Sequence, residues 1–241
     1  KLRSLMQENH IQYYIIPTND YHLSEYVGEY FGARKYMSGF TGSAGVLLVG
    51  LEEAGLWADG RYYIQAERQL EGSTITLFKQ GSEGVPVMED YLKSVLKDHE
   101  NIGFDGRVIP AKMGCGLESY VQAHGGQVIY DKDLVGQIWE DRPALSMEPA
   151  FLLDEKYTGE SAKSKLARVR EKMAERHADV HVLTSLDDIA WLLNIRGNDV
   201  ACNPVILSYA AVTKDKVYLF AHEEKFDAAM KDYFAQNGVC L

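Results

Sequence analysis

The sequence predicts an α/β protein made of two tandem, similar domains, each with a mixed, partly parallel sheet flanked by helices. Three observations support this fold class. Short apolar runs alternate with amphipathic segments, as expected for strands and helices that pack in layers. The order of these segments in the first half returns in the second half, although the residues differ. At 241 residues, with 46% hydrophobic residues, the chain is long enough for two packed cores.

The first domain begins with a helix, a strand and a segment rich in aromatic residues. Leu2 and Met6 fall on one face of the predicted helix, and residues 11–16 predict a strand because β-branched and aromatic side chains follow one another there. In the aromatic segment 21–36 we expect a short helix from Leu23. The aromatic side chains either pack around that helix or form a binding surface.

A glycine-rich loop at 36–45 then leads into two strands joined by a tight turn. Its glycines leave the backbone free to adopt positive φ angles and to approach neighbouring segments closely. The apolar run 46–49 predicts a buried strand, and residues 54–58 predict its partner. Apolar residues at helical spacing predict an amphipathic helix from Arg61.

The remainder of the first domain continues the alternation of strands and helices. Pro110 suits the first turn of a helix, which the glycines at 125–126 end. The predicted elements are a strand at 74–78, a helix with apolar positions from Met88 to Leu96, a strand at 101–104, the helix from Pro110, and a strand at 127–130.

A linker is predicted at 143–158, because two prolines and polar residues coincide there with a loss of periodicity. It separates a first domain at 1–142 from a second domain at 159–241. In the second domain, the helix at 161–176 should turn its lysines and arginines outward. A second helix, capped by Ser185, should bury its apolar residues, Trp191 among them. Further elements are strands at 180–184, 204–212 and 216–220 and a helix at 223–234.

The second domain is shorter than the first. The first copy continues for about sixty residues after its helix at Leu70, whereas the second ends a few residues after Phe234. We therefore expect the second domain to be truncated at its C-terminal end. The absence of an initial methionine at Lys1 and the abrupt end at Leu241 are also expected of a fragment.

The composition argues against several classes of partner. The chain carries 35 acidic and 25 basic residues, a formal net charge of −10, which repels nucleic acid phosphates and anionic membranes. No apolar run approaches the roughly 20 residues of a membrane-spanning helix. Three distant cysteines, Cys115, Cys202 and Cys240, predict neither a disulfide framework nor a zinc site. A reducing, cytoplasmic location fits this cysteine usage.

Catalytic motifs are absent from the sequence. Phe226 stands where a zinc protease has the second histidine of HExxH, counted from His222. Ser43 precedes a strand and does not lie between a strand and a helix, so it is no nucleophile elbow. There is no phosphate loop, and the glycines at 114–116 lack the third glycine and the acidic residue of a dinucleotide site. The sequence therefore offers no catalytic and no metal-binding residue.

One polar loop stands out in the second domain, between a hydrophobic helix and an apolar strand. It carries Asn194, Arg196, Asn198, Asp199 and Asn203, five hydrogen-bonding side chains within ten residues. Loops at the ends of sheets often present ligand contacts. Either Arg196 and Asp199 pair locally while the asparagines satisfy the turn backbone, or the loop contacts a ligand or another domain.

Four motifs resemble the N-terminal half of the three-domain Xaa-Pro aminopeptidases (aminopeptidase P). They are Tyr-Met-Ser-Gly-Phe-Thr-Gly-Ser-Ala-Gly at 36–45, Leu-Trp-Ala-Asp-Gly-Arg-Tyr at 56–62, Leu-Val-Gly-Gln-Ile-Trp-Glu-Asp-Arg-Pro at 134–143, and Leu-Asn-Ile-Arg-Gly-Asn-Asp-Val at 193–200 with Asn203-Pro204. The resemblance runs from about Leu2 to Phe234. It implies two creatinase/prolidase N-terminal domains of ribonuclease H-like type, the second incomplete. In that family a catalytic domain follows, in which two Asp, one His and two Glu hold two divalent metal ions, Mn or Zn.

The resemblance implies that this chain is the non-catalytic portion of a cytoplasmic enzyme that releases the N-terminal residue preceding proline. Its expected partners are its own C-terminal catalytic domain, a second copy in a homodimer, and proline-containing peptides. The implied dimer contacts are Tyr36, Phe40, Thr41 and Ser43, and the implied substrate-channel or domain contacts are Arg196, Asn198, Asp199 and Asn203. The alternative is a peptide-binding or chaperone-like scaffold without catalysis, because some relatives of the catalytic pita-bread domain have lost their metal ligands and serve as chaperones. A nucleotide-binding module is the weakest hypothesis.

Overall fold

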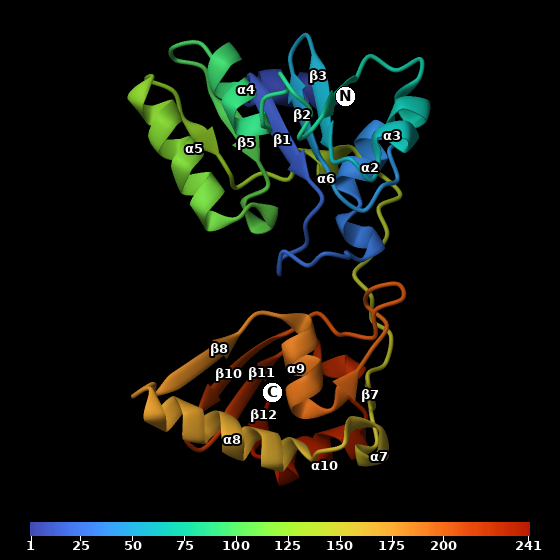
Figure 1. Cartoon of the computed structure of the whole chain (residues 1–241), viewed down its shortest axis with the longest axis vertical. Helices are drawn as coiled ribbons and strands as arrows, with labels where there is room; N and C mark the ends of the chain where they lie inside the picture. Colours follow the sequence, from blue (N-terminus) through green and yellow to red (C-terminus); the bar gives the residue numbers. More distant parts are fainter. The chain divides into compact units, whose positions relative to one another are not determined.

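The chain folds into two compact units, Lys1–Pro143 and Ala144–Leu241 (Figure 1). A computed structural model describes all residues from 1 to 241. We call the two parts unit 1 and unit 2 and describe each by itself. None of the helices in either unit is both long enough and apolar enough to cross a membrane.

Unit 1 is built on a six-stranded sheet in the order β4-β3-β2-β1-β5-β6. The pairs β1–β2 and β2–β3 are antiparallel, whereas β3–β4, β1–β5 and β5–β6 are parallel. The predicted mixed, partly parallel sheet is therefore confirmed. The strands are β1 (Tyr13–Pro17), β2 (Val46–Gly50), β3 (Ala54–Ala58), β4 (Thr76–Lys79), β5 (Ile102–Phe104) and β6 (Val128–Ile129).

Helices cover both faces of this sheet. Successive strand residues point to opposite sides, and apolar residues stand on both of them. On one face Tyr14 and Leu47 pack with helices α1, α3 and α6, and on the other Ile15 and Leu48 pack with α4 and α5. The helices are α1 (Leu2–Glu8), α2 (Ala33–Ser38), α3 (Tyr63–Leu70), α4 (Met88–Val95), α5 (Ala111–Ala123) and α6 (Leu134–Ile138), with 3-10 turns at Glu29–Phe31 and Gly106–Val108.

The predicted helix from Leu23 is wrong. Leu23 has a φ of 58°, in the left-handed region, which a right-handed helix cannot use. The side chain of Asp20 accepts hydrogen bonds from the backbone N–H groups of His22 and Ser24 and closes a turn at this point. The first helical turn begins only at Glu29.

Unit 2 contains a four-stranded sheet in the order β12-β11-β10-β8 and a separate pair, β7–β9. The strands are β7 (Phe151–Leu152), β8 (Val180–Leu183), β9 (Ile195–Arg196), β10 (Tyr209–Thr213), β11 (Val217–Phe220) and β12 (Val239–Cys240). The helices are α7 (Glu155–Thr158), α8 (Ala162–Glu175), α9 (Leu186–Leu193) and α10 (Ala228–Gln236), with a 3-10 turn at Glu223–Lys225. Strand β7 and helix α7 lie within the stretch 143–158 that the sequence predicts as a linker. Two-residue strands and one-turn helices carry too little periodicity to be detected.

The two units share one topology. In unit 1 the order β1-β2-β3-β4 has two antiparallel pairs followed by a parallel one, and β8-β10-β11-β12 of unit 2 repeats it. Helices α8, α9 and α10 occupy the positions in chain order of α1, α2 and α3. The predicted similarity of the two domains is therefore confirmed.

The helices of unit 2 pack against a single face of its sheet, where Leu183, Val212 and Leu219 share one core with α8, α9 and α10. Two burial predictions for these helices are wrong. Trp191 is 46% exposed, although it was expected to be buried, and Lys165 is buried, although the basic residues of α8 were expected to face outward.

Candidate functional site

The polar loop of unit 2 runs from Asn194 to Ser208 and connects α9 to β10. Asn194 ends α9 in the left-handed conformation, with φ 54°, which asparagine tolerates better than most residues. Gly197 lets the two arms of the loop touch, since a Cβ at this position would lie 2.2 Å from the Cγ2 atom of Ile206. The two arms of the loop are thus closely packed at Gly197.

A buried ion pair holds the loop from within. The Nζ atom of Lys225 lies 2.5 Å from Oδ1 of Asp199, and neither side chain has exposed area. The second carboxylate oxygen of Asp199 accepts a hydrogen bond of 2.7 Å from the backbone N–H of Leu207. The Asp199 side chain therefore ties both arms of the loop to the turn that carries Lys225, and buried charges need such partners.

Arg196 and Asp199 do not pair with each other. The Nη1 atom of Arg196 donates hydrogen bonds to the carbonyl oxygens of Ala190, at 2.7 Å, and Ile195, at 2.8 Å. These contacts place the half-buried guanidinium at the C-terminal end of α9, where it faces the negative end of the helix dipole. The interpretation that the two charged residues satisfy each other is therefore wrong.

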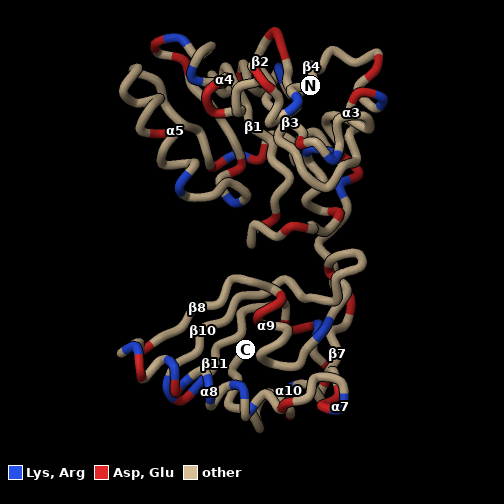
Figure 2. Tube along the Cα trace, viewed as in Figure 1, with Lys and Arg blue, Asp and Glu red and all other residues tan.

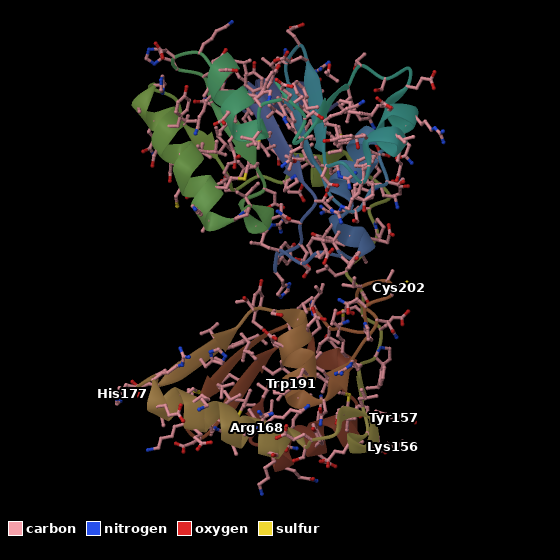
Figure 3. The ribbon with its side chains drawn as sticks, viewed as in Figure 1. Lys156, Tyr157, Arg168, His177, Trp191 and Cys202 are labelled. Atoms are coloured by element: carbon pink, nitrogen blue, oxygen red, sulfur yellow. The ribbon has the colours of Figure 1, made fainter.

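The exposed tip of the loop is formed by other residues. The side chain of Asn198 is exposed and lies 3.4 Å from the Oε2 atom of Glu148, measured from its Nδ2 atom. Asn203 is half-buried, and its backbone N–H donates a hydrogen bond to the carbonyl oxygen of Val200. Cys202, labelled in Figure 3, is exposed beside it with a φ of 62°. Of the candidates in this loop, Asn198 is thus exposed and Asn203 half-buried, whereas Asp199 is buried.

A second buried lysine supports the start of the loop. The Nζ atom of Lys165 donates to the carbonyl oxygen of Trp191 and to Oδ1 of Asn194, both at 2.7 Å, and lies 4.6 Å from the centre of the Trp191 ring. Burial lowers the pKa of Lys165. The sequence contained a signal for this residue, because Lys165 falls on the apolar stripe of α8 with Ala162 and Leu166.

The glycine loop of unit 1 is held by a buried arginine. Arg34 donates to the Thr18 hydroxyl at 2.8 Å, to the Phe40 carbonyl oxygen at 2.6 Å and to the Gly42 carbonyl oxygen, and its guanidinium lies 4.7 Å from the centre of the Phe40 ring. Burial lowers the pKa of Arg34 to about 10. The loop backbone is therefore arranged around one guanidinium.

The four candidates of this loop have different surroundings. Phe40 is a fully buried core residue. Tyr36 stacks on Trp139 with ring centres 4.6 Å apart and remains 41% exposed. Thr41 is exposed, and its hydroxyl accepts hydrogen bonds from two glutamines of α3, at positions 65 and 69. The Ser43 hydroxyl lies 2.7 Å from that of Tyr62. Tyr36 and Thr41 are thus the candidates with the most exposed surface.

Two matches to the family described as Creatinase/Prolidase N-terminal domain cover residues 1–130 and 141–241. They coincide with the two units that share one topology. The chain belongs to the creatinase/prolidase N-terminal domain family.

Relatives of these creatinase/prolidase-type units confirm the resemblance to Xaa-Pro aminopeptidase P. The chain is 41% identical over 238 residues to a probable Xaa-Pro aminopeptidase P of Coprinopsis cinerea, and 39% identical over 240 residues to one of Neurospora crassa. Each match covers 98% of this chain but only 38% and 35% of the relative. The chain thus spans little more than a third of the length of these proteins.

One solved structure is similar to nearly the whole chain. It is the X-prolyl aminopeptidase of Caenorhabditis elegans, described as a cytosolic enzyme with a di-nuclear active site. The match has a TM-score of 0.88 and 36% sequence identity, and it covers 95% of this chain and 37% of the other. In the 241 residues described here, no group of three His, Cys, Asp or Glu side chains could hold a metal ion. These residues therefore do not fit a di-nuclear metal centre of their own.

Proposed function

We propose that this chain is the non-catalytic N-terminal portion of a longer, metal-dependent Xaa-Pro aminopeptidase, which releases the N-terminal residue preceding proline in the cytoplasm. One observation carries the proposal. The similarity to probable Xaa-Pro aminopeptidases P extends over 98% of this chain and over only 38% of the relative's length. The two divalent metal ions, Mn or Zn, and their ligands then belong to the part of the enzyme outside residues 1–241.

The charged side chains of both loops support a positioning role. Arg34, Arg196, Asp199 and Lys225 all have backbone or side-chain partners inside their own unit. A catalytic acid, base or nucleophile must be able to reach the substrate. These groups shape surfaces and do not present reactive atoms to a substrate.

An activity assay tests this assignment. The isolated 241-residue chain, supplied with Mn²⁺ or Zn²⁺, is expected to release no N-terminal residue from an Xaa-Pro peptide, because it contains no site for a metal-activated water. The longer protein that contains this chain is expected to release it under the same conditions. Release by the isolated chain would show that the chemistry resides in residues 1–241. A longer protein that binds proline peptides without cleaving them would favour the scaffold alternative.

We further propose separate roles for the two loops in the longer protein. The loop of Tyr36, Phe40, Thr41 and Ser43 contributes a homodimer contact, which its exposed Tyr36 and Thr41 support. The loop of Arg196, Asn198, Asp199 and Asn203 contributes to the substrate channel or to a contact with the catalytic domain. Asn198, which is exposed, and Asn203, which is half-buried, support this role, because they are the polar candidates of the loop with accessible surface and no charge.

Thr41→Arg tests the dimer contact. The substitution adds a long charged side chain to each copy, so self-association of the longer protein should weaken about ten-fold or more, measured by sedimentation equilibrium. Thr74→Arg is the matched control, because Thr74 is also an exposed threonine of unit 1 and lies outside the loop. Equal dimer affinity of the two variants would remove the loop from the interface.

A further inference from the structure

Strand β7 and helix α7 expose apolar side chains outside both candidate loops. Met147, Phe151, Leu152 and Tyr157 are 46%, 43%, 37% and 71% exposed, and we call these four residues the ribbon patch. Tyr157 belongs to α7, which follows β7, and is labelled in Figure 3. The four side chains expose on the order of 400 Å² of mostly apolar surface. Apolar surfaces of this size on a protein mark binding sites.

The ribbon patch continues the surface of the polar loop. Strand β7 pairs with β9, and Phe151 lies opposite Arg196 in this register. Residues directly opposite each other in an antiparallel pair carry their side chains on one face, so Phe151 and Arg196 share a face of the ribbon. Glu148, just before β7, accepts a hydrogen bond of 3.4 Å from the side chain of Asn198 at the tip of the loop. The loop and the ribbon patch are therefore neighbours within unit 2.

The backbone of β7 offers one open pairing position. The N–H of Leu153 donates to the carbonyl oxygen of Asn194, so the N–H and C=O groups of Leu152 point away from β9, to the outer edge. In its two-stranded sheet, β7 has β9 as its only neighbour. Two residues earlier the outer edge is closed, because the N–H of Ala150 donates to the carbonyl oxygen of Lys225. Leu152 can thus pair with one residue of an extended peptide.

The size of the ribbon patch argues against a second copy of the chain as its partner. A stable dimer buries about 800 Å² on each subunit, about twice what the ribbon patch offers. The turn that carries Lys225 also leaves no room for a whole strand beside β7. A peptide of a few residues, by contrast, covers such a surface completely.

The charges around β7 indicate which peptide fits. The strand itself has no charged residue, and Figure 2 shows acidic residues before and after it. These are Glu148 on one side and Asp154 and Glu155 on the other. Lys156 pairs with Asp154 at 3.7 Å and offsets one of the three negative charges. An apolar, extended segment without acidic residues is therefore the ligand that this surface favours.

We infer that the ribbon patch is a subsite for the part of a substrate that follows its proline, and that Phe151 determines the residue preference there. Apolar side chains of the peptide pack on Phe151, and the backbone of one peptide residue exchanges two hydrogen bonds with Leu152. That residue must have an N–H group, so it is not itself a proline. The inference rests on the proposed function and on the role of the polar loop in the substrate channel.

Two peptides of equal length test the inference in the longer, metal-loaded protein: Ala-Pro-Val-Val-Val and Ala-Pro-Ser-Ser-Ser. The valine peptide is expected to have a kcat/KM about ten-fold higher, mainly through a lower KM. Phe151→Ser should reduce this ratio to about two-fold or less and leave the serine peptide unchanged. Val87→Ser is the matched control, because Val87 of unit 1 is 44% exposed and Phe151 is 43% exposed, and it should leave the ratio as it is.

Binding to the metal-free longer protein separates this inference from the proposed function, because binding requires no cleavage. In calorimetry the valine peptide should bind about ten-fold more tightly than the serine peptide, and Phe151→Ser should abolish the difference. If the metal-loaded protein cleaves neither peptide while this difference persists, the proposed function fails and the ribbon patch stands as a peptide site.

Three results would overturn the inference. The first is equal affinity of the wild-type protein for the two peptides. The second is a difference in affinity that Phe151→Ser leaves intact. The third is a loss of kcat/KM by the same factor for both peptides in Phe151→Ser, which would assign Phe151 to a contact with the catalytic domain.

Discussion

Asp199→Ala is expected to lower the free energy of unfolding of the chain by about 3–5 kcal/mol, because it leaves the Lys225 ammonium buried without a countercharge. It also removes the acceptor of the Leu207 N–H group. Urea denaturation of the 241-residue chain measures the loss. The result decides whether Asp199 acts as a channel residue or as the internal support of the loop.

Two further variants complete this experiment. Lys225→Met added to Asp199→Ala should recover most of the lost stability, since it removes the unpaired charge and keeps the volume filled. Asn198→Ala, the adjacent exposed position, should change the unfolding free energy by less than about 0.5 kcal/mol. A loss below about 1 kcal/mol for Asp199→Ala would mean that the pair is not the support of the loop, because breaking a buried pair costs several times more.

Arg34→Met should lower the unfolding free energy by roughly 3 kcal/mol, because the carbonyl oxygens of Phe40 and Gly42 and the Thr18 hydroxyl lose a shared charged donor inside unit 1. Lys35→Met is the matched control, since Lys35 makes only a surface ion pair with Glu29 at 3.5 Å, and it should cost about 0.5 kcal/mol or less. Urea denaturation again provides the measurement. Equal losses for the two variants would refute the role of Arg34 as the centre of the loop.

The sheets and the tandem repeat could be predicted because short apolar runs and helical spacing are local patterns that the sequence displays directly. Segment 46–49 and the helix after Ser185 were found where the structure has β2 and α9. The helix from Leu23 failed, since a turn closed by Asp20 determines the backbone there. Trp191 and Lys165 were assigned to the wrong environments, because hydropathy describes a side chain and not the neighbours available to it.

The candidate sites were predicted only in part, because their supporting contacts join residues that are distant in the sequence. The polar composition of 194–203 marked the loop, but its partner Lys225 lies 26 residues beyond Asp199, within the stretch predicted as a helix at 223–234. The aromatic and glycine residues near Tyr36 marked the other loop, but nothing local indicated that Arg34 would be buried. Pairings between distant residues are decided by tertiary packing, which residue patterns do not encode.

The two loops differ in the kind of group by which each is anchored. Arg34 binds two main-chain carbonyl oxygens of its loop, and every amino acid supplies such an oxygen. Lys225 binds a carboxylate that only position 199 supplies. Exposed positions of the first loop can therefore change during evolution while the loop keeps its shape, whereas the second loop keeps its shape only while the acidic residue and its lysine are inherited together.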